Sequence, residues 1–287
     1  MDMPILDRVV YAKLKDLALQ LENVLDADNF LYIGEINPAY KAVFVSEMEN
    51  LAKEKKHNKL AFHINTPGGS AEAVEMMVEV MRHHYKEVYF IVQDSAYSAG
   101  TILCMSGDKI YMNYSSTLGP IDPQVYSNGK LIPAQGYLDQ FDRILEKSKD
   151  GTITPLEIQI IRDLDIGDLH FYSQARNLTV TLLKKWLVMY KFKDWTEHST
   201  THEKVTQKEK EQRAEDIAKM LGNNAYWHSH GRHIGIKTLQ EKLKLKIEDY
   251  SSNTELSNLI KDYNMLAVDY ARKQGYQIFV HNRTIFS

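Results

Sequence analysis

Two short segments, about thirty residues apart, carry residue types suited to nucleophilic catalysis. The first, 63–70, contains Pro67-Gly68-Gly69, and the second, 94–101, contains Ser98-Ala99-Gly100. A Gly-Gly turn presents backbone N–H groups with no side chain in the way. A serine between small residues at a helix start has an accessible hydroxyl and a favourable local dipole. Together the two segments predict an oxyanion hole and its nucleophile, and therefore a serine hydrolase.

The same residues also allow a purely structural interpretation. Ser98 is equally well placed to cap a helix, with Gly100 permitting close helix packing. The catalytic interpretation requires the two turns to be adjacent, so that the N–H groups of Gly68, Gly69 and Ala99 surround one oxygen atom. Neighbouring strand ends of a parallel sheet would bring them together.

The pattern around these turns predicts such a sheet. Short apolar runs predict strands at 30–36, 60–64, 88–92 and 109–112, and apolar positions at helical spacing predict helices at 11–24, 40–55, 70–84 and 98–106. Strands alternating with helices indicate an α/β fold with a mostly parallel sheet, whose ligands lie outside the carboxyl ends of the strands. Both turns fall at that edge. Further helical patterns follow at 134–148, 155–191, 205–221 and 253–272.

Composition excludes several classes of function. The 287 residues carry a net charge of −3, which argues against a general nucleic-acid partner, and the single cysteine, Cys104, rules out a multi-thiolate metal site. No run approaches the ~18 apolar residues of a membrane span. The acidic start lacks the features of a secretion signal. We expect a cytoplasmic protein without a cofactor.

Four segments in matching order carry a family resemblance. They are 65–69, 94–101, 118–124 and 229–234. The chain resembles the Clp-protease and signal-peptide-peptidase-A clan, and within it the SDH-type (serine dehydrogenase) proteinases. The resemblance implies a crotonase/Clp-like superhelix of β-β-α units in a homo-oligomer, with Ser98 aligned with the nucleophile and Gly68, Gly69 and Ala99 with the oxyanion hole.

This resemblance also suggests the domain organisation and the substrate. We expect a single Clp/crotonase-like domain over 1–287, with a core at about 28–250, an N-terminal helix at 1–27 and a C-terminal helical extension at 251–287. The substrate would be a peptide or protein. No P-loop pattern is present, so the chain by itself would act without ATP.

The general base is not in the place that Clp peptidases use. The matching stretch, 119–123, contains no histidine. Signal peptide peptidases use a downstream lysine, and Lys147 and Lys149 fall in that window, although both look like cations at an exposed helix end. His230 is the favoured alternative, since the clan's equivalent segment passes near the active site and histidine suits a base near neutral pH.

Two further side chains and one pair of histidines are candidates for a role in the site. Asp122 could orient a base or substrate, although a structural turn between Pro120 and Pro123 is slightly favoured. Tyr97 could donate to the site or simply pack. The pair His228 and His230 resembles a metal-binding pair, but no thiol or carboxylate completes it in the sequence, so we expect no metal.

Two other classes of function remain open at this stage. A crotonase-like acyl-CoA enzyme would use the paired N–H groups to hold an enolate, and Ser98 would then be dispensable. A catalytically degenerate Clp-fold scaffold would explain the missing histidine. The leading hypothesis is a serine endopeptidase.

Overall fold

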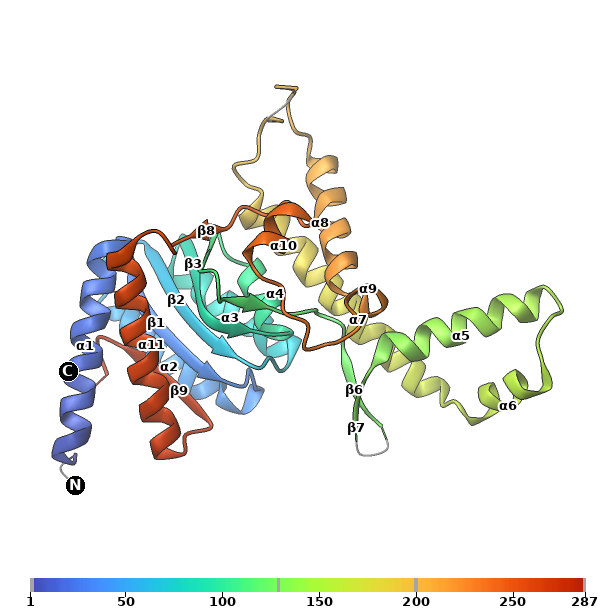
Figure 1. Ribbon diagram of the computed structural model, residues 1–287, viewed down its shortest axis with the longest axis horizontal. Coiled ribbons are helices and arrows are strands. Elements are labelled where there is room, and N and C mark those ends of the chain that lie inside the picture. The colour runs from blue at the N-terminus through green and yellow to red at the C-terminus, as the bar shows by residue number, and fades with distance from the viewer. Residues whose placement is uncertain (1–2, 128–129, 199–200, 286–287) are drawn as a thin grey trace.

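The centre of the molecule is a sheet with the strand order β8-β4-β3-β2-β1-β9 (Figure 1). The computed structural model describes residues 3–127, 130–198 and 201–285, except for the side chains of 126–131. The strands are β1 (Asp28–Gly34), β2 (Lys59–Thr66), β3 (Glu87–Ala96), β4 (Lys109–Met112), β8 (Glu248–Asp249) and β9 (Ile278–Asn282). All neighbours are parallel except β9, which runs antiparallel to β1. The predicted α/β fold with a mostly parallel sheet is confirmed.

Helices cover both faces of this sheet, which explains why the central strands read as continuous apolar runs. On one face lie α2 (Lys41–Lys53), α3 (Ala71–His84) and α4 (Ala99–Met105). The short helix η1 (Pro38–Tyr40) comes directly before α2. Their core includes a row of aromatic rings across three strands, with ring centroids 5.4 Å apart for Phe30–Phe62 and 5.5 Å for Phe62–Phe90.

The two ends of the chain share the opposite face. Helices α1 (Ile5–Leu25) and α11 (Thr254–Gln274) pack against each other there (Figure 1). The C-terminal segment is more than the helical extension expected from its pattern, because β9 adds a strand to the sheet. Arg283, just after β9, forms buried ion pairs with Glu22 (2.5 Å) and Asp28 (3.1 Å), which tie this end to the first helix and strand.

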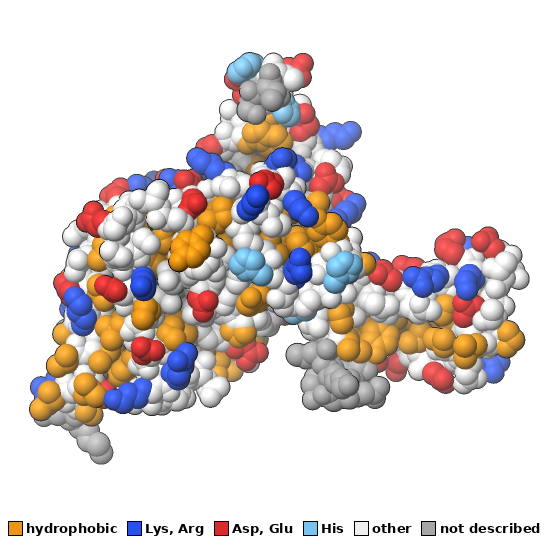
Figure 2. All heavy atoms as spheres, in the orientation of Figure 1, with side chains coloured by type: hydrophobic (Ala, Val, Ile, Leu, Met, Phe, Trp, Pro, Cys, Tyr) orange, Lys and Arg blue, Asp and Glu red, His pale blue; other side chains and the backbone are white. Residues whose placement is uncertain are grey.

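An arm projects from this α/β body (Figure 1). Strand β5 (Thr117–Leu118) still belongs to the sheet, where it pairs with the end of β3, and the arm begins after it with the hairpin β6 (Gln124–Ser127) and β7 (Lys130–Pro133). Helices α5 (Ala134–Lys149) and α6 (Pro155–Asp163) and the start of α7 (Ile166–Trp186) complete it. Figure 2 shows apolar side chains along the arm, and Leu145, Leu156 and Ile166 are exposed there.

The single helical run predicted over 155–191 is divided in the structure. Leu164 has an extended backbone, and the Asp165 side chain accepts a 2.7 Å hydrogen bond from the Gly167 N–H group, so a new helix begins there. The run ends in a π-helical turn, η2 (Leu187–Lys191). The remaining helices are α8 (Gln207–Leu221), α9 (Asn224–Trp227) and α10 (Ile236–Glu241). Among the described residues, no helix combines the length and apolarity needed to cross a membrane.

Candidate active site

The two glycine- and serine-containing turns meet at the carboxyl ends of β2 and β3, as the sequence predicted. The Tyr97 N–H group donates to the Thr66 carbonyl (3.1 Å), which joins the ends of the two strands. Gly68 has φ +113°, and a Cβ atom built on it would lie 2.9 Å from the Cβ atom of Ser98. The glycine turn therefore lies directly against Ser98, and only a residue without a side chain allows this approach.

Gly69 is fixed by a second contact of the turn. Its φ is +144°, and a Cβ atom on it would lie 2.0 Å from the Ile36 carbonyl oxygen. Ile36 donates to the Gly68 carbonyl and accepts from the Ser70 N–H group, both at 2.8 Å. In such a parallel bridge the N–H group of the intervening residue, Gly69, points away from Ile36.

Ser98 has a backbone that L-residues rarely adopt, with φ 50° and ψ −114°. Such a conformation costs on the order of 1–3 kcal/mol and is found mainly at functional sites. Ser98 lies between β3 and α4, at the start of the helix. Its side chain lines the cavity and makes no capping hydrogen bond to α4. The strained turn favours the chemical interpretation of Ser98 over the structural one.

Two of the three predicted oxyanion donors are free to bind a ligand. Within the described ranges, the N–H groups of Gly69 and Ala99 donate to no other protein atom. The Gly68 N–H group, by contrast, donates to the Thr66 hydroxyl (3.1 Å). Gly68 thus shapes the turn and approaches Ser98, while Gly69 and Ala99 offer the open donors.

His230 and Asp122 are in hydrogen-bond contact at the edge of the site. The Asp122 carboxylate is fully buried, and its Oδ1 lies 2.9 Å from His230 Nδ1. Its Oδ2 accepts from Gln124 Nε2 (2.8 Å) and Asn224 Nδ2 (3.1 Å). Because a carboxylate only accepts hydrogen bonds, Nδ1 carries the proton in this contact, and in the neutral imidazole Nε2 is then the acceptor.

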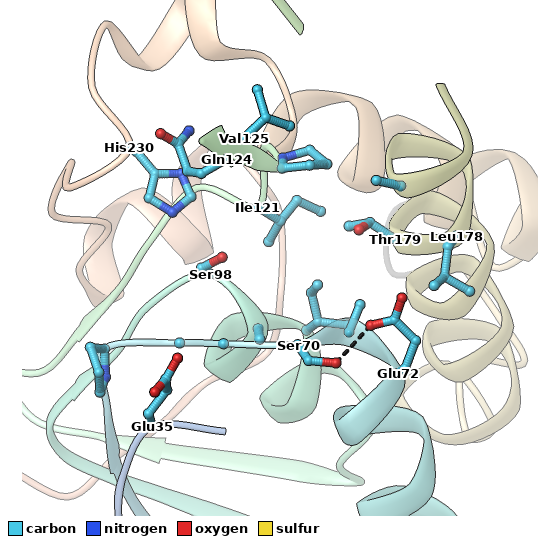
Figure 3. Close-up of a pocket in the computed structure, with 18 of the residues that line it drawn as sticks. Glu35, Ser70, Glu72, Ser98, Ile121, Gln124, Val125, Leu178, Thr179 and His230 are labelled. Carbon is cyan, nitrogen blue, oxygen red and sulfur yellow. Dashed lines mark hydrogen bonds between the residues drawn. The ribbon is translucent and has the colours of Figure 1, made fainter. Parts of the chain in front are cut away.

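The loop carrying His230 reaches this position through a long-range bridge. Leu118 and Ile234 exchange two backbone hydrogen bonds of 3.0 Å, which fixes the loop after α9 beside the segment that holds Asp122. Figure 3 shows the His230 ring beside Ser98 in the same pocket. Ser98 and His230 thus line the same pocket, and His230 in turn contacts the buried Asp122 carboxylate.

A cavity of about 720 Å³ opens at these groups. Its apolar wall comes from α4, the Asp122 segment, the hairpin and α7, and consists of Ile102, Ile121, Val125, Phe171, Ala175 and Leu178. Phe171 is 61% exposed, although it belongs to this wall. The cavity is of the size that holds a drug-sized ligand or a few residues of a peptide.

Residues 36–203 match the family of ClpP-like SDH-type serine proteinases, a segment that covers more than half of the chain. The chain belongs to this family. The predicted family is thereby confirmed, and it classes the protein among the serine peptidases in general. The family match itself assigns no role to any residue.

Curated relatives of this SDH-type proteinase are two uncharacterized proteins of Methanocaldococcus jannaschii. One is 27% identical over 125 residues, which are 42% of this chain and 41% of the relative. The other is 32% identical over 92 residues, which are 31% of this chain and 32% of the relative. The chain thus spans less than half the length of either relative.

Solved structures with some similarity include two of the 1510-N membrane-bound stomatin-specific protease. A mutant of that protease has a TM-score of 0.44 and 15% identity, with 79% of this chain and 83% of the other covered. A second mutant, in complex with a substrate peptide, has the same TM-score and 16% identity, with 79% and 78% covered.

The structure does not bring the two candidate lysine bases to Ser98. Lys147 forms an ion pair with Glu157 (2.5 Å), and Lys149 with Glu146 (2.7 Å). Both lysines lie at the end of α5 on the projecting arm, and neither lines the cavity. Each ammonium group is thus engaged with a carboxylate on the arm, away from the cavity.

Three other side chains are also placed away from the chemistry. Tyr97 does not line the cavity; a Cβ atom on Gly119 would lie 2.4 Å from its ring, so Tyr97 packs on that glycine. Cys104 is fully buried, and burial raises the pKa of its thiol, which keeps it unreactive. His228 ends α9 with a left-handed backbone. No His, Cys, Asp and Glu cluster able to hold a metal occurs in the described part of the chain.

Sequence reasoning missed the groups that support the triad and close the pocket. Asn224 and Gln124 satisfy the second oxygen of Asp122, and Phe171 and Leu178 from α7 form one wall. The roles of Asn224 and of the α7 residues arise from contacts between distant segments, so no local signal identifies them, whereas Gln124 lies only two residues from Asp122. The amide at 224 lies 102 residues from the carboxylate it contacts.

Proposed function

We propose that this SDH-type proteinase is a serine endopeptidase that uses Ser98 as nucleophile, His230 as general base and Asp122 as the group that orients His230. The observation that carries the proposal is the 2.9 Å contact between Asp122 Oδ1 and His230 Nδ1 beside Ser98. It supplies the base that the sequence lacks at the usual Clp position. The triad then follows the chain order serine, aspartate, histidine.

The proposed reaction has two stages, acylation and then deacylation of Ser98. Ser98 Oγ bonds to the peptide carbonyl carbon as its proton passes to His230 Nε2, and the negative oxygen is held by the N–H groups of Gly69 and Ala99. The C–N bond then breaks, and the amine leaves with the proton from His230. The oxygen of a water molecule then bonds to the acyl carbon as its proton passes to the same imidazole; the ester C–Oγ bond breaks, the product carboxylic acid leaves, and His230 returns the proton to Ser98 Oγ.

The test is labelling with a fluorophosphonate probe, read by intact mass. One adduct is expected on the wild-type protein, none on Ser98→Ala, and a rate reduced by at least about 100-fold on His230→Ala. His233→Ala, a neighbouring exposed histidine, and Lys147→Ala serve as matched controls that should label at the wild-type rate.

Three results would overturn parts of the proposal. Loss of labelling in Lys147→Ala with retention in His230→Ala would transfer the role of the base to the lysine. An adduct that survives Ser98→Ala would place the nucleophile elsewhere. No adduct on folded wild-type protein would favour a catalytically degenerate scaffold. Action without ATP, a cytoplasmic location and homo-oligomerisation stay predictions of the sequence.

A further inference from the structure

The cavity beside Ser98 has an uneven distribution of charge. Two carboxylates, Glu35 and Glu72, line it, and the lining contains no lysine or arginine within the described ranges. Neither glutamate takes part in an ion pair with the described part of the chain, in contrast to Glu157 and Glu215, which are paired with lysines. The electrostatic field of the pocket therefore favours a cationic ligand group.

Glu72 is held in a defined orientation in this pocket. The Ser70 hydroxyl donates to Glu72 Oε2 at 2.6 Å, while the same hydroxyl accepts from the Ala73 N–H group at 3.1 Å. Figure 3 shows the Glu72 carboxylate reaching from the first turn of α3 toward the side of the pocket formed by Leu178 and Thr179. This fixed carboxylate loses less conformational entropy on binding than a free one would.

The surroundings of Glu72 suit a long side chain with a charged end. Leu178 and Ile102 supply apolar surface in the same cavity. Lysine and arginine combine an apolar stem with a cationic head, so the stem can cover the apolar wall while the head meets the carboxylate. An acidic side chain would meet Glu35 and Glu72 without any compensating cation.

We propose that the pocket selects polypeptides with lysine or arginine beside the scissile bond, and that Glu72 is the residue that recognises this charge. The inference rests on the proposed peptidase function, because it names the substrate class of the same pocket. Glu35 adds to the negative potential from the β1 side of the cavity.

The first test is a peptide library in which each position near the scissile bond carries lysine, norleucine or glutamate. At one position, kcat/KM is expected to be roughly 10- to 100-fold higher for lysine than for the neutral norleucine. Glu72→Gln should reduce the lysine-to-norleucine ratio to the smaller preference that Glu35 alone provides, and Glu72→Lys should favour glutamate. Glu79→Gln, an exposed position of α3 outside the cavity, should keep the wild-type ratio.

A binding measurement separates this inference from the proposed chemistry. Ser98→Ala protein is titrated with fluorescent lysine and norleucine peptides, and fluorescence anisotropy gives the two Kd values. Tighter lysine binding that is lost on adding Glu72→Gln supports the inference even if no peptide is cleaved. Equal Kd values, or a preference that Glu72→Gln leaves at its wild-type size, would overturn it. A merely structural role of Glu72 at the start of α3 would change Tm and leave the ratio intact.

Discussion

Asp122→Asn tests the orientation of the base without changing the size of the side chain. In the wild-type protein, three side-chain N–H groups converge on the buried carboxylate, from His230, Gln124 and Asn224. An amide has only one oxygen to offer in place of two. When its NH₂ group faces His230 Nδ1, the imidazole must carry its proton on Nε2 and can no longer accept the proton of Ser98.

The size of the effect follows from this change of tautomer. In the chymotrypsin-type triad the corresponding change lowers kcat by about 10⁴-fold. The side chain of His230 is 27% exposed, so water can stabilise part of the productive tautomer. We therefore expect a loss of about 10²- to 10⁴-fold, which corresponds to about 3–5 kcal/mol of transition-state stabilisation. Stability should fall by less than about 3 kcal/mol, because the amide keeps some of the hydrogen bonds.

The assay compares the second-order rate constant for fluorophosphonate labelling with the Tm of the same samples. Asp163→Asn, on α6 of the arm and outside the cavity, is the matched control and should label like the wild type. A folded Asp122→Asn protein that labels within about threefold of the wild type would refute the reasoning, since Asp122 would then have no part in orienting His230.

Three further predictions concern the backbone and the pH dependence. Gly69→Ala should lose activity and at least about 1–3 kcal/mol of stability, because its Cβ atom meets the Ile36 carbonyl, whereas Gly136→Ala on α5 has open space and should be neutral or stabilising by Tm. Ser98→Gly should be inactive but more stable than Ser98→Ala by up to about 1 kcal/mol in urea denaturation, because glycine accepts the positive φ. Burial lowers the pKa of His63 to about 3, so the unfolded chain binds more protons than the folded one between that pH and pH 6.5. The contribution of neutral His63 to the free energy of unfolding is therefore complete above pH 6.5 and falls as the pH drops toward 3. Between pH 7 and pH 5, the free energy of unfolding of His63→Leu should fall by about 1–2 kcal/mol less than that of the wild type. Equal losses for the two proteins, measured by urea denaturation at both pH values, would contradict this.

The sheet and its catalytic edge could be predicted because their signals are local. The strand at 109–112 was predicted with the observed bounds, and the turns after β2 and β3 lie where the alternation of strands and helices placed them. Short strands completed by distant partners were missed. β9 has only five residues, and its pairing with β1 brings together segments about 250 residues apart. No local pattern encodes such a pairing.

The sequence by itself determined the residue types that could do the chemistry. The glycines of Pro67-Gly68-Gly69 carry conformational freedom, and Ser98 of Ser98-Ala99-Gly100 carries a hydroxyl. These properties belong to the covalent structure of the residues, so they can be recognised without knowledge of the fold. The family resemblance rested on the same local motifs and was confirmed over 36–203.

Only the tertiary structure shows which of the candidate bases lies in the cavity with Ser98. His230, Lys147 and Lys149 were all open from the sequence, and Asp122 was slightly favoured as a turn residue. The bridge between Leu118 and Ile234 brings His230 to Asp122 across 108 residues, while α5 carries the lysines out along the arm. A base must lie within hydrogen-bond reach of its nucleophile, and that distance is set by the packing of remote segments, which spacing along the chain does not encode.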